Sequence, residues 1–282
     1  DGKHFVTARG WDDLSEMIKL YEENGLAVDE QLICQYLQDA RISKDFAIYY
    51  DLFNKYRSDY QVEKILDGTV SESIVLRAER ASMDERLSLL GLIFDSVTAQ
   101  LRTVCERENI LDLVTGQLKT LKEKLKDVSG AAALLSEMIE AEREKLERGK
   151  QSSSISPQAQ RETRFMLEYL EEFRAAVMQS GTAQKDEFSV VRESFAQKVA
   201  ELKGLAADGG RALENVFSFC EKAFADGDEI LIFVTELTAN YYSARFIGRY
   251  GCDRYYMHNK QLQFDQRQQE IIKRMDEIQW TV

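Results

Sequence analysis

Proline is almost absent from this 282-residue sequence, which has one, Pro157. Histidine is nearly as rare, with only His4 and His258. The cysteines are few and widely separated, and none forms a Cys-x-x-Cys pair: they are Cys34, Cys105, Cys220 and Cys252. No known zinc site can be assembled from these spacings, so we expect no metal ligands. Scattered, unpaired cysteines are typical of reduced thiols, which favours the cytoplasm.

The sequence also lacks a positive charge balance and a long hydrophobic run. Its net charge is −12, and an acidic chain is a poor match for a phosphate backbone, so we expect no nucleic-acid partner. We find no signal peptide. The longest apolar run, Ile230–Val234, is too short to span a bilayer, so we expect no membrane partner.

The residues that bind and hydrolyse ATP are missing as well. The nearest approach to a phosphate-binding loop is the string Gly204–Arg211, which has two glycines at the right spacing. It lacks the following Lys-Ser/Thr, no predicted strand precedes it, and no acidic strand for Mg²⁺ is recognisable. We therefore predict that this chain has no catalytic residues and is not itself an enzyme. The string is interpreted as a bend between two helices, at Gly209 and Gly210.

What the chain has instead is a composition and a periodicity typical of helices. Glu, Lys, Gln, Leu and Ala dominate, and charged residues make up 30%. Apolar residues recur every seven positions along one seam: Leu90, Val97, Val104, Leu111, Leu118 and Leu125. Leu87, Phe94 and Leu101 supply a second seam, and the spacing slips near Glu108. This pattern predicts an all-α fold, an elongated helical bundle with a long antiparallel coiled-coil-like arm.

We divide the chain into three regions. Residues 1–67 are a lid-like helical region, 68–205 the long helical arm, and 206–282 a C-terminal helical region that packs back on the arm or lid. Helices are expected over these ranges: 11–24, from 28, 43–60, 83–126, 130–148, 157–180, 183–205, 211–224, 230–250 and 252–280. The aromatics between Phe46 and Tyr60 are interpreted as core rather than as a ligand cage.

The segment from Glu236 to His258 is rich in side chains that could do chemistry. Asn240 would need hydrogen-bond partners if buried, and Cys252 and His258 are six residues apart. We favour a structural core with satisfied polar groups. A partner-docking surface and a Cys–His nucleophile remain the alternatives.

One short stretch points to a family. Thr7-Ala8-Arg9-Gly10 opens the first helix, and Val28-Asp29-Glu30 opens the second. This stretch, from Val6 to about Leu66, resembles the end of the helical lid subdomain of MoxR-type AAA+ ATPases. There a (Ser/Thr)-x-Arg-Gly/Ala sequence starts the sensor-2 helix. Those proteins often have proline where this chain has Ala8.

The resemblance implies that Arg9 is a sensor-2 arginine, which contacts the ATP phosphate only in the full-length protein. It implies that the sequence is the C-terminal part of a longer ATPase, with ATP and Mg²⁺ bound by an upstream AAA+ core. The parent would be a homo-hexamer with a chaperone-like role in maturing other complexes, and with von Willebrand factor A domain proteins as partners. The alternative is a stand-alone α-helical coiled-coil scaffold or adaptor with no nucleotide role.

Overall fold

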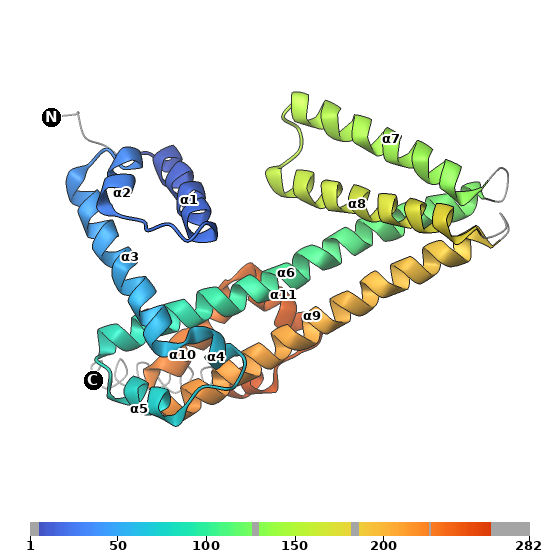
Figure 1. The fold of residues 1–282 in the computed structure, drawn as a ribbon. Helices are drawn as coiled ribbons and strands as arrows, with labels where there is room; N and C mark the ends of the chain where they lie inside the picture. The colour runs from blue at the N-terminus through green and yellow to red at the C-terminus, as the bar shows by residue number, and fades with distance from the viewer. Residues whose placement is uncertain (1–5, 126–129, 182–185, 226, 261–282) are drawn as a thin grey trace, which may run out of the picture.

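The computed structural model describes residues 6–125, 130–181, 186–225 and 227–260 (Figure 1). All regular elements in these residues are helices, so the all-α prediction is confirmed. They are α1 (Ala8–Glu23), α2 (Glu30–Tyr36), α3 (Ala40–Tyr60), α4 (Val62–Leu66), α5 (Glu72–Arg80), α6 (Met83–Lys124), α7 (Ala131–Gln151), α8 (Pro157–Ser180), α9 (Glu187–Phe224), α10 (Asp228–Ala239) and α11 (Tyr241–Tyr250). Residues 253–260 are also helical.

The N-terminal three helices enclose a small core of their own. This N-terminal core consists of the buried residues Leu14, Ile33 and Leu37. The hydroxyl of Thr7 caps α1 by accepting a hydrogen bond from the backbone N–H of Gly10, at 2.9 Å. Because this cap fixes the first turn, α1 begins three residues before the predicted Trp11.

The largest core lies where the end of α3 meets α4, α5, the start of α6, the end of α9, α10 and α11 (Figure 1). We call this the basal core. Its fully enclosed side chains include Tyr60, Leu89, Phe217 and Phe233. The basal core therefore joins residues from both ends of the chain around the two long helices.

The two long helices α6 and α9 leave the basal core together and end in a four-helix assembly with α7 and α8 (Figure 1). The buried residues there form the distal core, which includes Leu121, Leu135, Leu170, Phe173 and Val191. A small middle core, comprising Leu101, Val104, Cys105, Ala206 and Phe246, lies between the basal and distal cores. Helix α6 thus contributes apolar side chains to all three.

The heptad positions from Leu90 to Leu111 are buried, as the seam predicts, and Leu118 and Leu125 are partly buried. Leu87 is 39% exposed, so its assignment to the second seam is wrong. Of the described helices, α6 is the one long and apolar enough to cross a membrane by length and composition alone. The core helix of a soluble protein passes the same test.

The structure corrects one predicted break and one predicted continuous helix. No bend occurs at Gly209 and Gly210, because α9 runs unbroken through both. Gly209 instead allows α6 and α11 to pack closely against α9. A Cβ at this position would lie 3.2 Å from the Leu101 side chain of α6 and 3.5 Å from the Phe246 ring of α11. The predicted helix over 230–250 is divided at Asn240, which ends α10 and caps α11. Of the predicted helix over 252–280, residues 261–280 lie outside the described residues. The three-region division stays a prediction.

Candidate functional site

Arg9 is the second residue of α1 and lies in its first turn. Its side chain is 89% exposed, and its contact is a long ion pair with Asp13, at 3.6 Å between Nε and Oδ2. A pair this open is weak, so the guanidinium is free to turn toward another group. The N-terminal turn of a helix also carries a partial positive charge, which favours an anion nearby.

The residues around Arg9 show why the local sequence is constrained. A Cβ at position 10 would lie 2.7 Å from the backbone carbonyl oxygen of Tyr36, so glycine allows α1 to pack against the end of α2. Asp29 caps α2 by accepting a hydrogen bond from the backbone N–H of Leu32, at 2.8 Å. The Thr-x-Arg-Gly and Val-Asp-Glu elements therefore fix the relative placement of the first two helices.

An apolar groove lies beside this first helix. Its volume is about 250 Å³, and Trp11 and Ile18 of α1 face Phe46, Tyr49 and Phe53 of α3 across it. The Trp11 and Phe46 rings meet edge to face with centroids 5.1 Å apart. Tyr49 is 60% exposed, whereas Tyr60 is fully buried. The interpretation of these aromatics as core is therefore right for Tyr60 and wrong for Tyr49.

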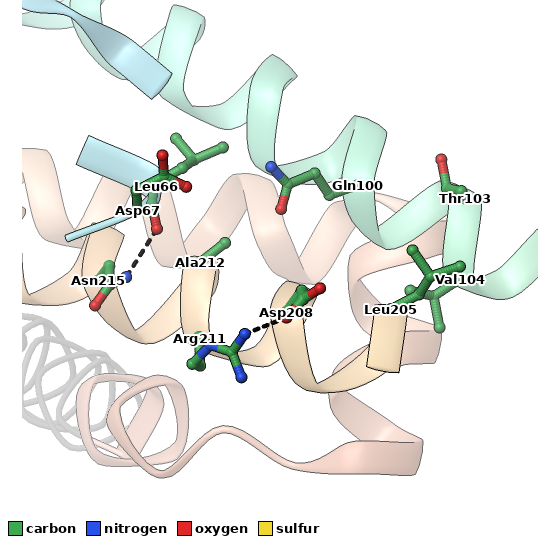
Figure 2. Close-up of a pocket in the computed structure, with 11 residues that line it drawn as sticks. Leu66, Asp67, Gln100, Thr103, Val104, Leu205, Asp208, Arg211, Ala212 and Asn215 are labelled. Atoms are coloured by element: carbon green, nitrogen blue, oxygen red, sulfur yellow. Dashed lines mark hydrogen bonds and ion pairs between the residues drawn. The ribbon is translucent and has the colours of Figure 1, made fainter. Parts of the chain in front are cut away.

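A cleft of about 740 Å³ lies between α4, α6 and α9 (Figure 2). Gln100 and Thr103 project from α6, and Asp208 and Arg211 form an ion pair on α9 (Figure 2). Asn215 closes one end by donating a hydrogen bond from Nδ2 to the backbone carbonyl of Leu66, at 2.8 Å. These polar groups satisfy one another or face solvent, so the cleft carries no reactive constellation. The Gly204–Arg211 string forms part of its α9 wall, as continuous helix.

A buried carboxylate, Glu108, occupies the point where the heptad slips. It is 2% exposed and accepts a hydrogen bond from the Tyr250 hydroxyl, at 2.5 Å. Arg245 Nη2 lies 3.1 Å from one carboxylate oxygen and Arg249 Nε lies 2.9 Å from the other. Burial and the hydrogen bond to Glu108 raise the pKa of Tyr250 to about 12. All three partners belong to α11, so this network attaches α11 to the middle of α6.

The polar residues after α11 attach the last described helix to α9. Cys252 lies 3.3 Å from a carboxylate oxygen of Glu214, and burial raises the pKa of its thiol to about 12. His258 Nε2 lies 3.0 Å from Glu221 Oε1, and its ring stacks on Phe217. A thiol with this pKa is not a nucleophile at neutral pH. The arrangement therefore supports the structural interpretation of this segment over the Cys–His one.

Among the described residues, no group of three or more His, Cys, Asp or Glu side chains could hold a metal ion. No protein-family model, curated protein or solved structure matches this chain. The sequence predicted that Arg9 lies at the start of a helix, which the structure confirms, and its role as a site residue stays a prediction. The sequence did not predict the groove beside Arg9 or the Glu108 network. The one signal for the network was the slip in the heptad at Glu108.

Proposed function

We propose that this chain is the non-catalytic C-terminal part of a MoxR-type AAA+ ATPase. In this proposal α1 to α3 belong to the lid, and α6 to α9 form an antiparallel coiled-coil-like arm that binds partners. The lid couples the nucleotide state of the ATPase to that arm. The parent acts as a cytoplasmic homo-hexamer that matures other complexes, with von Willebrand factor A domain proteins among its partners.

The observation that carries the proposal is the position of Arg9. A sensor-2 arginine must stand at the start of a lid helix with its guanidinium free to reach a phosphate. Arg9 is in the first turn of α1 and 89% exposed. A guanidinium pairs with phosphate oxygens through two parallel hydrogen bonds, and the helix N-terminus adds a favourable field.

The apolar groove supports the same proposal. Exposed apolar side chains are frequent in and between the first three helices: they include Trp11, Leu20, Leu26, Ile42, Ile48, Tyr49 and Leu52. Two of them, Trp11 and Tyr49, line the groove, and an apolar groove of this kind is typical of a surface that another protein segment covers. In the proposal that segment is the upstream AAA+ core, which also supplies the residues that bind ATP and Mg²⁺.

A stand-alone helical scaffold with no nucleotide role is the second candidate. The heptad seam, the net charge of −12 and the four-helix distal end fit it equally well. It leaves the exposed Arg9 without a role, although the helix caps of Thr7 and Asp29 and the close approach at Gly10 would serve a scaffold as well. The two candidates differ in what precedes Asp1 in the gene.

The test has two parts. First, the reading frame upstream of Asp1 is translated and searched for a phosphate-binding loop followed by an acidic Mg²⁺ strand. Second, steady-state ATP hydrolysis is compared for the longer protein and for this chain alone. We expect the motifs upstream, turnover by the longer protein and background turnover by the chain alone. An upstream sequence without these motifs would favour the scaffold, and turnover by the purified chain would contradict the proposal.

A further inference from the structure

Helix α3 links two separate cores. Phe46 and Ala47, near its start, pack against the N-terminal core. Phe53 and Tyr56 pack against the basal core, and Tyr60, the last residue of α3, is part of it. Figure 1 shows the N-terminal helices standing away from the base, with α3 running between them. The orientation of α1 and α2 relative to the base is therefore set by the joint at the end of α3.

That joint is a clamp on Tyr60, whose side chain is fully buried. Its hydroxyl donates a hydrogen bond to Glu85 Oε1, at 2.7 Å. The guanidinium of Arg77 lies over its ring, 5.0 Å from the centroid, and Arg77 Nη2 also pairs with Asp59 Oδ2 at 2.8 Å. The clamp thus joins α3 to α5 through Arg77 and to α6 through Glu85.

The backbone prevents α3 from sliding through the clamp. Gln61 follows Tyr60 in the left-handed conformation, with φ of 49° and ψ of 57°, so the helix ends there. The next helix, α4, is held by Val62 and Ile65, which are fully buried in the basal core. A rotation of α3 about its own axis would draw Tyr60 out of its pocket and unpair Glu85.

Glu85 lies in the first turn of α6, where its backbone N–H donates to the hydroxyl of Ser82. Helix α6 has 42 residues and runs from this joint to the distal core. At 1.5 Å per residue it spans about 60 Å, so a tilt of about 10° at its base moves its far end by about 10 Å. Any tilt of α6 at this joint is therefore amplified at its distal end.

We propose that α3 is a lever, fixed to α6 by the Tyr60 clamp, that transmits rotation of the N-terminal helices to the distal four-helix end. That a nucleotide drives the rotation rests on the function proposed above. The rigid joint is a property of this chain alone. The test of the rigid joint therefore needs neither nucleotide nor the longer protein, and its outcome does not depend on whether the proposed function is right.

The test measures the distance between spin labels at Asp12→Cys on α1 and Glu123→Cys near the end of α6, both exposed, in a Cys34→Ser background. Cys34 is replaced because it is the free cysteine that is not buried. Pulsed electron spin resonance reports the width of the distance distribution. We expect one narrow distribution for the double-labelled chain. In Tyr60→Phe, loss of the hydroxyl contact with Glu85 should loosen the joint and widen the distribution; over the length of α6, each degree of wobble adds about 1 Å.

Tyr250→Phe is the matched control. It also removes a tyrosine hydroxyl that donates a hydrogen bond to a glutamate, the buried Glu108, but this contact lies away from the joint. It should leave the distribution narrow. Arg77→Met, which keeps the stem but removes the charge over the ring, should widen it as Tyr60→Phe does. Circular dichroism selects the variants that fold. If only one of Tyr60→Phe and Arg77→Met folds, that variant alone tests the joint. A broad distribution in the unmutated joint, or equal widths for joint variants and control, would overturn the proposal.

Discussion

Replacing Glu108 with alanine tests whether the buried network holds α11 on the middle of α6. The substitution removes a carboxylate that is 2% exposed, together with its contacts to Arg245, Arg249 and Tyr250. Arg249 is 57% exposed, so solvent screens its pairing and its contribution is small. Arg245 is 24% exposed and loses its carboxylate partner in a largely buried setting. Its pairing therefore dominates the expected loss.

Breaking a buried pair by removing one partner costs about 3–5 kcal/mol, and the partial exposure of Arg245 favours the low end, about 3 kcal/mol. At about 2–4 °C per kcal/mol for chains of this size, the Tm of Glu108→Ala falls by about 6–12 °C. The assay is urea and thermal unfolding followed by circular dichroism. Glu106→Ala is the matched control, because Glu106 pairs with Arg102 one turn away on the surface of the same helix. That control should lose about 0.2–1 kcal/mol. Equal losses for the two variants would refute the reasoning that the Glu108 network is a buried attachment.

Three further outcomes follow from particular contacts. Gly10→Ala places a Cβ within 2.7 Å of the Tyr36 carbonyl oxygen and should destabilise the N-terminal helices by about 1–3 kcal/mol in urea unfolding. Gly91→Ala, which has open space around it on α6, should be neutral or stabilising by about 0.5–1 kcal/mol. A larger loss for Gly91→Ala than for Gly10→Ala would contradict the packing of α1 on α2. With a thiol reagent at neutral pH, Cys34 should react quickly. The other three thiols, Cys105, Cys220 and Cys252, should react only on unfolding, because they are buried and burial raises the pKa of each. Rapid labelling of all four thiols in the folded protein would contradict this prediction. Burial, with a hydrogen bond to a glutamate, raises the pKa of Tyr60 and of Tyr250 to about 12, so the folded state keeps these protons longer than the unfolded state. The contribution of these two neutral phenols to the free energy of unfolding is therefore fully present below pH 10, and it is lost as the pH rises from about 10 to about 12. Tyr250→Phe should flatten that part of the stability–pH curve, and an unchanged slope would argue against the Glu108 contact.

Local signals in the sequence predicted much of the helical framework. Pro157 is the first residue of α8, where the sequence predicted a helix to begin, and Ser156 caps that helix in the structure. The heptad seam predicted the burial of Val97, Val104 and Leu111. These signals work because a cap or a helix face is decided by residues a few positions apart.

The misses have two physical causes: contact between residues distant in sequence, and a local cap inside a predicted helix. Gly209 and Gly210 look like a bend, yet α9 continues because Leu101 and Phe246 pack against Gly209. Asn240 lies inside a predicted continuous helix, yet its side chain accepts hydrogen bonds from the backbone of Tyr242 and Ser243 and starts a new helix. Hydrophobic periodicity detects neither effect, because the first depends on tertiary packing and the second on a polar cap.

The residues of the candidate sites were likewise only partly predictable from the sequence. Arg9 at a helix start was predictable, because Thr7 and Gly10 flank it in a recognisable cap. The Tyr60 clamp and the Glu108 network were not, since Glu85 lies 25 residues from Tyr60 and Arg245 lies 137 residues from Glu108. A slip in a heptad marks where such a partner is needed but does not name it.

The central claim is that Arg9 senses nucleotide, and the most direct measurement is steady-state ATP hydrolysis by the longer protein carrying Arg9→Ala. A charged hydrogen bond contributes about 1.5–3 kcal/mol, so we expect turnover to fall about ten- to a hundred-fold with the fold intact by circular dichroism. Arg41→Ala is the matched control, because Arg41 is exposed and holds the same second position in α3 that Arg9 holds in α1. It should hydrolyse ATP at the wild-type rate. Wild-type turnover and nucleotide affinity in Arg9→Ala would contradict the claim and leave the scaffold as the better account.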